Sequence, residues 1–431
     1  MKKTLISTLV LSSLSLFSLN LSAEDLKTVY QLATQKDPVV QRAAATRDAA
    51  AARIDVSKAS LLPTISLDIE AGRSTRENLR FSSDNAVGAT LQARQSVFSW
   101  TNWQNLSRAE KVALQNQTVY DAELQSLILR VTNAYFDVLK ANDNLTFVAA
   151  EKRSVERQLE QTKQRFAVGL TAITDVHEAQ AQFDSVVARE INSENQLENA
   201  REALREITGQ YHEQVAQLNT DKFSTSRPTP EAATDWVSIA EQNNLTLKAQ
   251  RIALDVSALD IDLAKAGHLP TLTANASVGV TKVSGVDRAD TSSLGLTLAV
   301  PIYSGGGIEA NVRVAQANYV EVSQALEQSH RSVVRQIRSS FNNVNSQMSQ
   351  IRALEQAVIS AQSALQATEA GFEVGTRTIV DVLLSTRNLF DAQRNLSGAR
   401  YDYILAQLQL KQAAGNLSEQ DLLAINNALT N

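Results

Sequence analysis

The stretch FEVGTRTIVDV, residues 372–382, repeats the stretch FAVGLTAITDV, residues 166–176. Each copy ends a long helical pattern, places a glycine where the backbone can reverse, and begins a second helical pattern near an aspartate. The two glycines, Gly169 and Gly375, are 206 residues apart. Because the match covers a whole helix-turn-helix segment, it predicts that the chain contains two copies of one structural unit.

Other motifs recur at nearly the same distance. Leu62-Pro63-Thr64 returns as Leu269-Pro270-Thr271, and Phe98-Ser99 returns as Tyr303-Ser304. Pro228 and Pro230 mark a linker between the two copies. We therefore expect a first repeat at residues 24–219, a linker at 220–231, a second repeat at 232–415 and a C-terminal helix within 416–431.

The segments before the two turns are typical of very long helices. Neither glycine nor proline occurs between Gly88 and Gly169 or between Gly307 and Gly371. Apolar residues there recur every three or four positions, which is coiled-coil spacing. Helices of roughly 65 residues would reach about 100 Å. The sequence thus predicts two long helical hairpins.

Each copy also carries a pair of alternating segments, at residues 62–97 and 270–301. Apolar residues such as Ile65, Leu67 and Ile69 alternate with polar ones, so each strand has one apolar and one polar face. We expect the connecting loops at Arg73–Asn85 and Lys282–Ser292.

Two interpretations of these hairpins remain open from periodicity alone. They could pack on the helices of a soluble protein, or they could be tilted membrane strands of about ten residues. Four strands cannot close a membrane barrel, so in lipid several chains would each contribute four, and three chains would give twelve.

The first 23 residues are typical of an export signal, with Lys2 and Lys3 before an apolar run and Ser22-Ala23 before an acidic start. An uncleaved anchor is the alternative, but the run is short for a spanning helix. Cleavage changes the formal net charge from −5 to −7, which gives no reason to expect nucleic acid. The absence of cysteine excludes disulfides, thiol catalysis and an N-terminal lipid on cysteine.

Taken together, the export signal, the paired Leu-Pro-Thr motifs, the strand hairpins and the two turn motifs resemble the TolC family of outer-membrane efflux channels. The segment EQDLLAINNAL at residues 419–429 supports the resemblance. It implies a homotrimer with a twelve-stranded barrel in the outer membrane and a helical tunnel through the periplasm. It also implies partners, namely outer-membrane lipid, a periplasmic adaptor protein and an inner-membrane pump of the RND or ABC type. The channel itself would be passive and without cofactors.

The resemblance further implies a closed tunnel mouth at the helical turns. Three copies of Asp381 would form a ring that attracts cations, although an acid at a helix start is also favoured by the helix dipole. Leu384 stands where the family has a second aspartate, so we expect weaker block by multivalent cations. The resemblance also suggests a closed-state lock made by Arg377, Thr174 and Asp175, with Glu369, Gln158 and Arg400 nearby. Phe372 replaces a lock-forming tyrosine of the family.

The remaining motifs do not indicate catalysis. Gly305-Gly306-Gly307 lacks the Lys-Ser/Thr of a phosphate-binding loop and suits a strand-to-helix junction. Aromatic residues near the strand ends suit a membrane-interface belt or simple packing; they are Phe98, Trp100, Trp103 and Tyr303. The histidines lack metal spacing; they are His177, His212, His268 and His330.

Two other classes of protein compete with an export channel. An exported coiled-coil structural protein or adhesin would explain the helices and the signal, but not four alternating strands at repeat-equivalent positions. A periplasmic enzyme is disfavoured because no convergent set of polar residues is visible. The sequence therefore favours an export channel.

Overall fold

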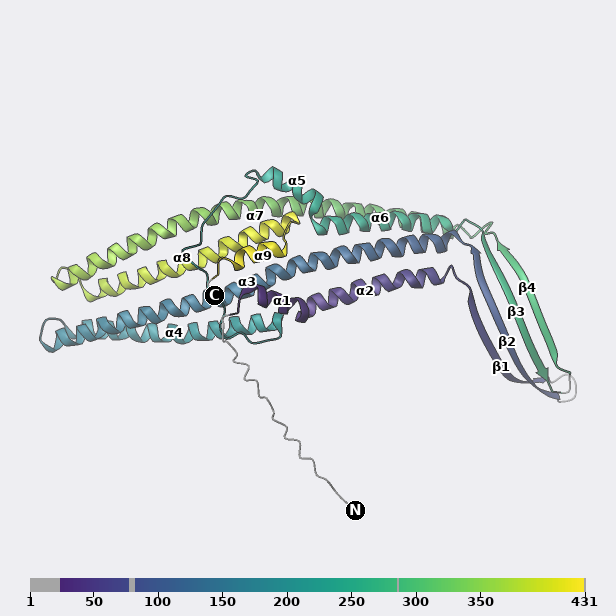
Figure 1. Cartoon of the computed structure of the whole chain (residues 1–431), viewed down its shortest axis with the longest axis horizontal. Helices are drawn as coiled ribbons and strands as arrows, with labels where there is room; N and C mark the ends of the chain where they lie inside the picture. The colour runs from purple at the N-terminus through teal and green to yellow at the C-terminus, as the bar shows by residue number, and fades with distance from the viewer. Residues whose placement is uncertain (1–23, 77–81, 285–286, 430–431) are drawn as a thin grey trace, which may run out of the picture.

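The computed structural model describes residues 24–76, 82–284 and 287–429, so the expected export signal at 1–23 lies outside the described residues. Helices and strands form one elongated body, with a sheet at one end and two helical turns at the other (Figure 1). The first half contains α1 Leu26–Lys36, α2 Pro38–Ala59, β1 Thr64–Arg76, β2 Ser82–Phe98, α3 Trp100–Ala167 and α4 Ile173–Thr208. The second half contains α5 Ala233–Asn243, α6 Leu245–Ala266, β3 Thr271–Val283, β4 Ala289–Ala299, α7 Gly307–Glu373, α8 Ile379–Ala414 and α9 Glu419–Asn426.

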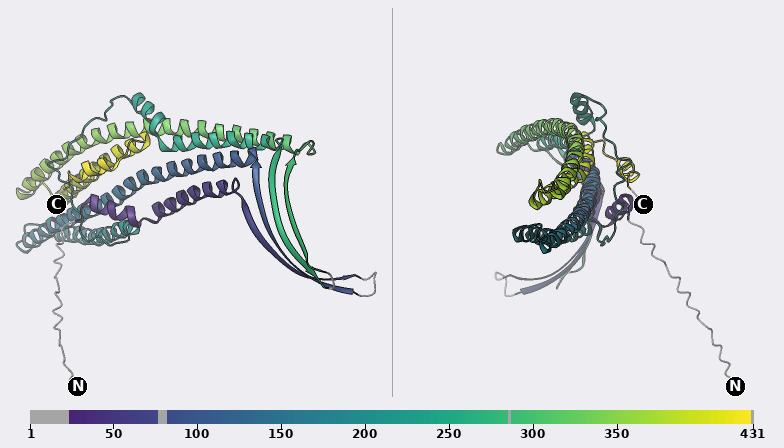
Figure 2. Two further views of the ribbon diagram at one scale, coloured as in Figure 1. Left: turned by 45° about the vertical axis from the view of Figure 1, so that its right-hand side comes forward. Right: turned by 90° about the vertical axis from the view of Figure 1, so that its left-hand side faces the viewer.

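The two central helices account for the length of the molecule. Helix α3 has 68 residues and α7 has 67, so each is about 100 Å long at a rise of 1.5 Å per residue. Both helices run from the sheet to a turn (Figure 1). Helix α3 pairs with α2 near the sheet and with α4 near the turn, and α7 pairs with α6 near the sheet and with α8 near the turn. Viewed along the axis, the helices form a curved wall (Figure 2).

The sheet is antiparallel, in the order β1-β2-β3-β4. Its register places apolar residues opposite one another on one face: Leu67 pairs with Leu91, and Leu91 pairs with Val278. Polar residues occupy the other face, where Ser277 pairs with Ser293. Alternation along each strand and antiparallel register together give the sheet one apolar and one polar face.

The strands are longer than the sequence alone indicated. Strand β1 continues to Arg76 and β2 begins at Ser82, so pairing replaces most of the loop expected at Arg73–Asn85. Strand β3 continues to Val283 and β4 begins at Ala289. Strands pair through backbone hydrogen bonds, which do not require apolar and polar residues to alternate. Polar residues can therefore extend these strands beyond the segments in which the sequence alternates. Residues 77–81 and 285–286 of the expected loops lie outside the described residues.

The hydrophobic core has two parts. The larger part lies midway along the molecule, where α1, α5 and α9 pack around α3, α7 and α8, and it includes Tyr135, Phe136 and Tyr403. A smaller cluster lies near the turns and includes Val155, Val186 and Leu383. No helix in the described part of the chain is both long enough and apolar enough to span a membrane.

Candidate functional site

The two helical turns lie at the same end of the molecule, opposite the sheet (Figures 1 and 2). Gly169 and Gly375 adopt left-handed backbone angles, with φ of 76° and 80°. Each turn closes through backbone N–H groups that donate to the end of the preceding helix: Leu170 to Arg165 and Thr376 to Gly371, both at 2.8 Å. Glycine is needed at these two positions because other residues rarely adopt such angles.

The second turn ends in a capping box at the start of α8. The Thr378 hydroxyl accepts a hydrogen bond from the Asp381 backbone N–H at 3.3 Å, and Asp381 Oδ2 accepts from the Thr378 backbone N–H at 2.9 Å. Two orphan donors at the helix start are thereby satisfied. The backbone N–H and the hydroxyl of Thr378, helped by the Arg377 charge, lower the pKa of Asp381 below its ordinary value. Asp381 is thus held as an ionised carboxylate.

Arg377 lies beside this capping box. It is exposed, and its side chain passes close to the backbone of Gly371, where an added Cβ would be 2.7 Å from Arg377 Cγ. A larger residue at position 371 would therefore push Arg377 away. The second turn thus places one cation, Arg377, four positions before one carboxylate, Asp381.

The first turn has different chemistry. Ala172 occupies the N-cap of α4 and makes no side-chain capping bond. The Thr171 hydroxyl donates to the Asp175 carboxylate, so this carboxylate is bound by a side chain rather than by a capping box. Thr174 is exposed. The described contacts within one chain do not join Thr174 or Asp175 to Arg377, so the expected lock among them stays a prediction.

A cavity of about 710 Å³ separates the two hairpins just above the turns. Gln158 and Glu369 both line it, together with Phe372. Gln158 Nε2 donates to Thr386 Oγ1 at 2.9 Å, which joins α3 to α8. The Arg165 guanidinium lies 4.6 Å from the centre of the Phe372 ring, an attractive cation–π contact. The structure therefore brings Gln158, Glu369 and Phe372 to one gap.

Arg400 does not lie with the turn residues, which corrects the expectation that it stands nearby. It is nineteen residues beyond Asp381 on α8, a distance of about 28 Å along a helix. Its guanidinium lies 5.8 Å from the centre of the Phe223 ring, in the middle of the molecule. Within one chain, Arg400 thus belongs to the packing of the linker against α8.

Sequence reasoning missed Thr386 and Arg165. Thr386 is fully buried among the apolar positions Val382, Leu383 and Leu389, and its hydroxyl is the acceptor for Gln158. A polar residue that interrupts an apolar stripe was the available signal. Arg165 gave no such signal, because its partner Phe372 is 207 residues away in the chain.

The junction between sheet and helices carries Pro63 and Pro270, each directly before the first residue of a strand. Proline suits these positions because it has no N–H to donate to a ladder. Near the same junction, Phe98, Trp100, Trp103 and Tyr303 expose 44%, 43%, 53% and 87% of their surface. All four rings are exposed in a single chain, and their place in a membrane-interface belt stays a prediction. Gly305 and Gly306 adopt left-handed angles directly before α7.

Three of the four histidines have polar partners in the described contacts. His212 is buried between the Glu24 carboxylate and the Thr208 hydroxyl, while His268 and His330 pair with Glu309 and Glu241 at 3.2 and 2.9 Å. Within residues 24–76, 82–284 and 287–429, no cluster of three or more metal-binding side chains is present.

Comparison with known proteins places this geometry in a family. The family model described as outer membrane efflux protein matches residues 29–210 and 236–416. Outer membrane protein TolC of Vibrio cholerae serotype O1 is 48% identical, with 99% of each chain covered. Outer membrane protein TolC of Escherichia coli K12 is 44% identical, covering 99% of this chain and 90% of that protein. A more distant relative, proteases secretion protein PrtF of Dickeya chrysanthemi, is 27% identical over 98% of this chain and 94% of its own.

The fold is also that of solved channel structures. The crystal structure of CusC superposes with a TM-score of 0.81 at 18% identity, covering 91% of this chain and 92% of CusC. At this identity the likeness shows the fold alone. The family model, which matches most of the chain, and the two TolC proteins, which are 44% and 48% identical over 99% of it, carry the assignment. The chain belongs to the outer membrane efflux protein family.

Proposed function

We propose that this chain is the outer-membrane exit duct for drug efflux and for type I protein secretion. Membership of the outer membrane efflux protein family supports efflux, and the relative named for protease secretion supports secretion. The observation that carries the proposal is the exposure of the apolar face of the four-stranded sheet. This face is large, yet nothing in the described chain covers it. Ile65, Leu67 and Ile69 expose 71%, 61% and 70% of their surface, and Leu294 exposes 87%. Such a face suits lipid.

The edges of the sheet support a trimer. Strands β1 and β4 are the edges, and neither has a second neighbour among the described strands. Unpaired backbone groups are costly in lipid, so each edge needs a strand from another chain. Pairing β4 of one protomer with β1 of the next closes a barrel of twelve strands from three chains, with the polar face inside. The curved helical wall of each protomer then forms one third of a periplasmic tunnel.

The turns form the tunnel mouth in this proposal. Three copies of Asp381, held ionised by the capping box, would form a ring that concentrates cations. Arg377, Thr174 and Asp175 would lock neighbouring protomers together, with Gln158 and Glu369 lining the gap between hairpins. Exposed pairs of this kind contribute about 1 kcal/mol or less each, so several must act together and the mouth can still open. The trigger is recruitment by a periplasmic adaptor and an inner-membrane RND or ABC-type pump.

A deletion in the native host tests this function. The deletion strain should become sensitive to detergents and drugs and should lose secretion of a type I substrate. Complementation with the full chain is the control and should restore both. Heat-modifiable trimers in the outer-membrane fraction are also expected. An unchanged strain, or a monomer outside that fraction, would contradict the proposal and favour an exported structural protein.

A further inference from the structure

The two helical hairpins of one chain meet along α3 and α8. Helix α3 packs on α4 of its own hairpin and on α8 of the other. Polar contacts between α3 and α8 occur at four levels, starting from the turns. They are Gln158 with Thr386, Glu151 with Arg394, Asp143 with Ser397 and Tyr401, and Lys140 with Asp402.

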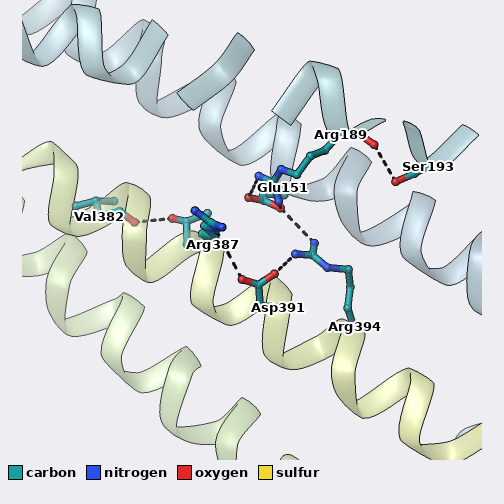
Figure 3. Close-up of polar contacts among 8 residues, drawn as sticks. Glu151, Arg189, Ser193, Val382, Arg387, Asp391 and Arg394 are labelled. Atoms are coloured by element: carbon teal, nitrogen blue, oxygen red, sulfur yellow. Dashed lines mark hydrogen bonds and ion pairs between the residues drawn. The ribbon is translucent and has the colours of Figure 1, made fainter. Parts of the chain in front are cut away.

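Glu151 is the buried charge of this joint, with none of its surface exposed. Arg189 on α4 donates to both of its oxygens, from Nη1 at 3.0 Å and from Nη2 at 2.6 Å. Arg394 on α8 donates to Glu151 Oε2 at 3.2 Å and also binds the Asp391 carboxylate. Figure 3 shows both guanidinium groups converging on Glu151 from opposite sides. One carboxylate therefore links α3, α4 and α8.

Below this level, toward the turns, the joint is weaker. The hydrogen bond from Gln158 to Thr386 joins two uncharged groups, and Gln158 Oε1 is buried without a partner. A cation–π contact between Arg165 and Phe372 and the apolar residues of the smaller cluster complete this part. The cavity of about 710 Å³ also lies here. The described contacts between hairpins below Glu151 include no ion pair.

Above Glu151 the joint is stronger. Asp143 accepts hydrogen bonds from the hydroxyls of Ser397 and Tyr401, the latter at 3.0 Å. Burial raises the pKa of Tyr401 far above its ordinary value, so its hydroxyl keeps the proton that it donates. Lys140 Nζ lies 2.7 Å from Asp402. The larger hydrophobic core begins at this level with Tyr401 and Phe136.

Separating the hairpins therefore becomes abruptly harder at Glu151. Pulling Arg394 away would leave a carboxylate buried with one partner fewer, and breaking a buried pair is far more costly than breaking an uncharged hydrogen bond. We propose that the Glu151–Arg189–Arg394 cluster is the pivot at which opening of the tunnel mouth stops. The hairpins separate between Glu151 and the turns, about 24 Å along α3, and stay joined above. This inference rests on the proposed channel function and adds the position of its hinge.

Cysteine labelling tests the pivot without relying on transport. The chain contains no cysteine, so Ser397→Cys and Ser193→Cys each introduce one thiol per chain. Ser397 lies on α8 against Asp143, and Ser193 lies on α4, where Asn144 donates to it at 2.9 Å. Both therefore report on packing against α3 just above Glu151. Only Ser397 reports on the joint between hairpins.

The measured quantity is the rate of maleimide labelling in the purified full chain. Arg394→Gln should speed labelling of Ser397→Cys on the order of tenfold and leave Ser193→Cys within about twofold, because local opening then extends past the lost link. Lys152→Gln is the matched control. It removes an ion pair with Glu190 that stays inside the first hairpin, and it should change neither rate. If labelling becomes equally faster at both cysteines, Arg394→Gln has destabilised the chain generally. If labelling of Ser397→Cys does not become faster, the cluster is not a pivot. Either result overturns the proposal.

Disulfide staples test the same pivot in planar bilayers. A staple between Gln158→Cys and Thr386→Cys should hold conductance at its lowest level until a reducing agent is added. A staple between Asp143→Cys and Ser397→Cys should leave conductance unchanged. If the upper staple also lowers conductance, the pivot is misplaced. A chain that conducts in no form would overturn the proposed channel function, and the labelling rates would still decide the pivot.

Discussion

The two helical turns share a backbone but differ in their chemistry. Both reverse through a left-handed glycine, and both begin the next helix with an extended N-cap residue. In the first turn that residue is Ala172, which cannot cap, and Asp175 is bound by a neighbouring hydroxyl. In the second turn Thr378 and Asp381 form a capping box beside Arg377. Backbone geometry is thus shared, while charge is concentrated in the second turn, where we expect the gate.

The largest expected effect is the loss of cation binding from the second turn. Asp381→Asn should weaken block by a multivalent cation at least about tenfold, because the proposed trimer would lose three carboxylates around one axis. The measurement is conductance in planar bilayers during cation titration. Asp175→Asn, the equivalent change in the first turn, should alter block far less. Equal effects of the two changes would remove the distinction between the turns.

The next prediction concerns closure. Arg377→Glu should raise conductance severalfold, because a carboxylate beside Asp381 and near acidic neighbours repels rather than locks. Thr171→Glu, at the equivalent position of the first turn, serves as the control and should have a smaller effect. Unchanged conductance in Arg377→Glu would exclude Arg377 from the gate.

A third prediction uses the exposed Leu384, one helical turn after Asp381, with 55% of its surface exposed. Leu384→Asp should strengthen cation block severalfold by adding a second ring of carboxylates. In the first copy the equivalent residue is already acidic, Glu178, and Glu178→Gln provides the comparison. No change in block after Leu384→Asp would show that position 384 does not face the conducted ions.

The capping box also predicts a pH dependence. Hydrogen bonds from Thr378 lower the pKa of Asp381 within one chain and so help it keep its charge as pH falls. Repulsion among the three carboxylates of the proposed ring acts in the opposite direction. Cation block should be lost as this charge is lost, measured as conductance at a series of pH values. Thr378→Ala should move the midpoint of the loss upward, because it removes the hydroxyl that donates to Asp381 while the backbone N–H remains. If cation block is half lost at the same pH in Thr378→Ala as in the unaltered chain, Thr378 is not the cause of the lowered Asp381 pKa.

The smallest expected effect is on stability. Thr378→Ala should cost about 1 kcal/mol of unfolding free energy through loss of the cap. Ala172→Thr should stabilise the first turn by a similar amount, because Ala172 already has extended backbone angles and Asp175 stands at the position of a capping-box acid. Denaturant unfolding of the two variants measures both changes. A loss of stability in Ala172→Thr would show that the first turn is constrained in some other way.

Much of the architecture could be predicted from local patterns. The long helices and the alternating strands follow from periods of 3.6 and 2 residues, and the two turns follow from glycine's access to left-handed backbone angles. The resemblance placed Arg400 near the second turn, whereas within one chain it lies beside Phe223 of the distant linker. Glu151 was not singled out, since Arg394 is 243 residues away from it in the chain.

By itself, the sequence determined the elements of this protein and the chemistry of each turn, because backbone conformation and capping depend on residues within a few positions. Only the tertiary structure decided which of the scattered charges became buried and paired. Glu151, Arg189 and Arg394 look like ordinary solvated helix residues in the sequence. They form one cluster around the buried Glu151 because α4 and α8 both pack on α3, and the burial of that carboxylate makes the loss of a partner costly.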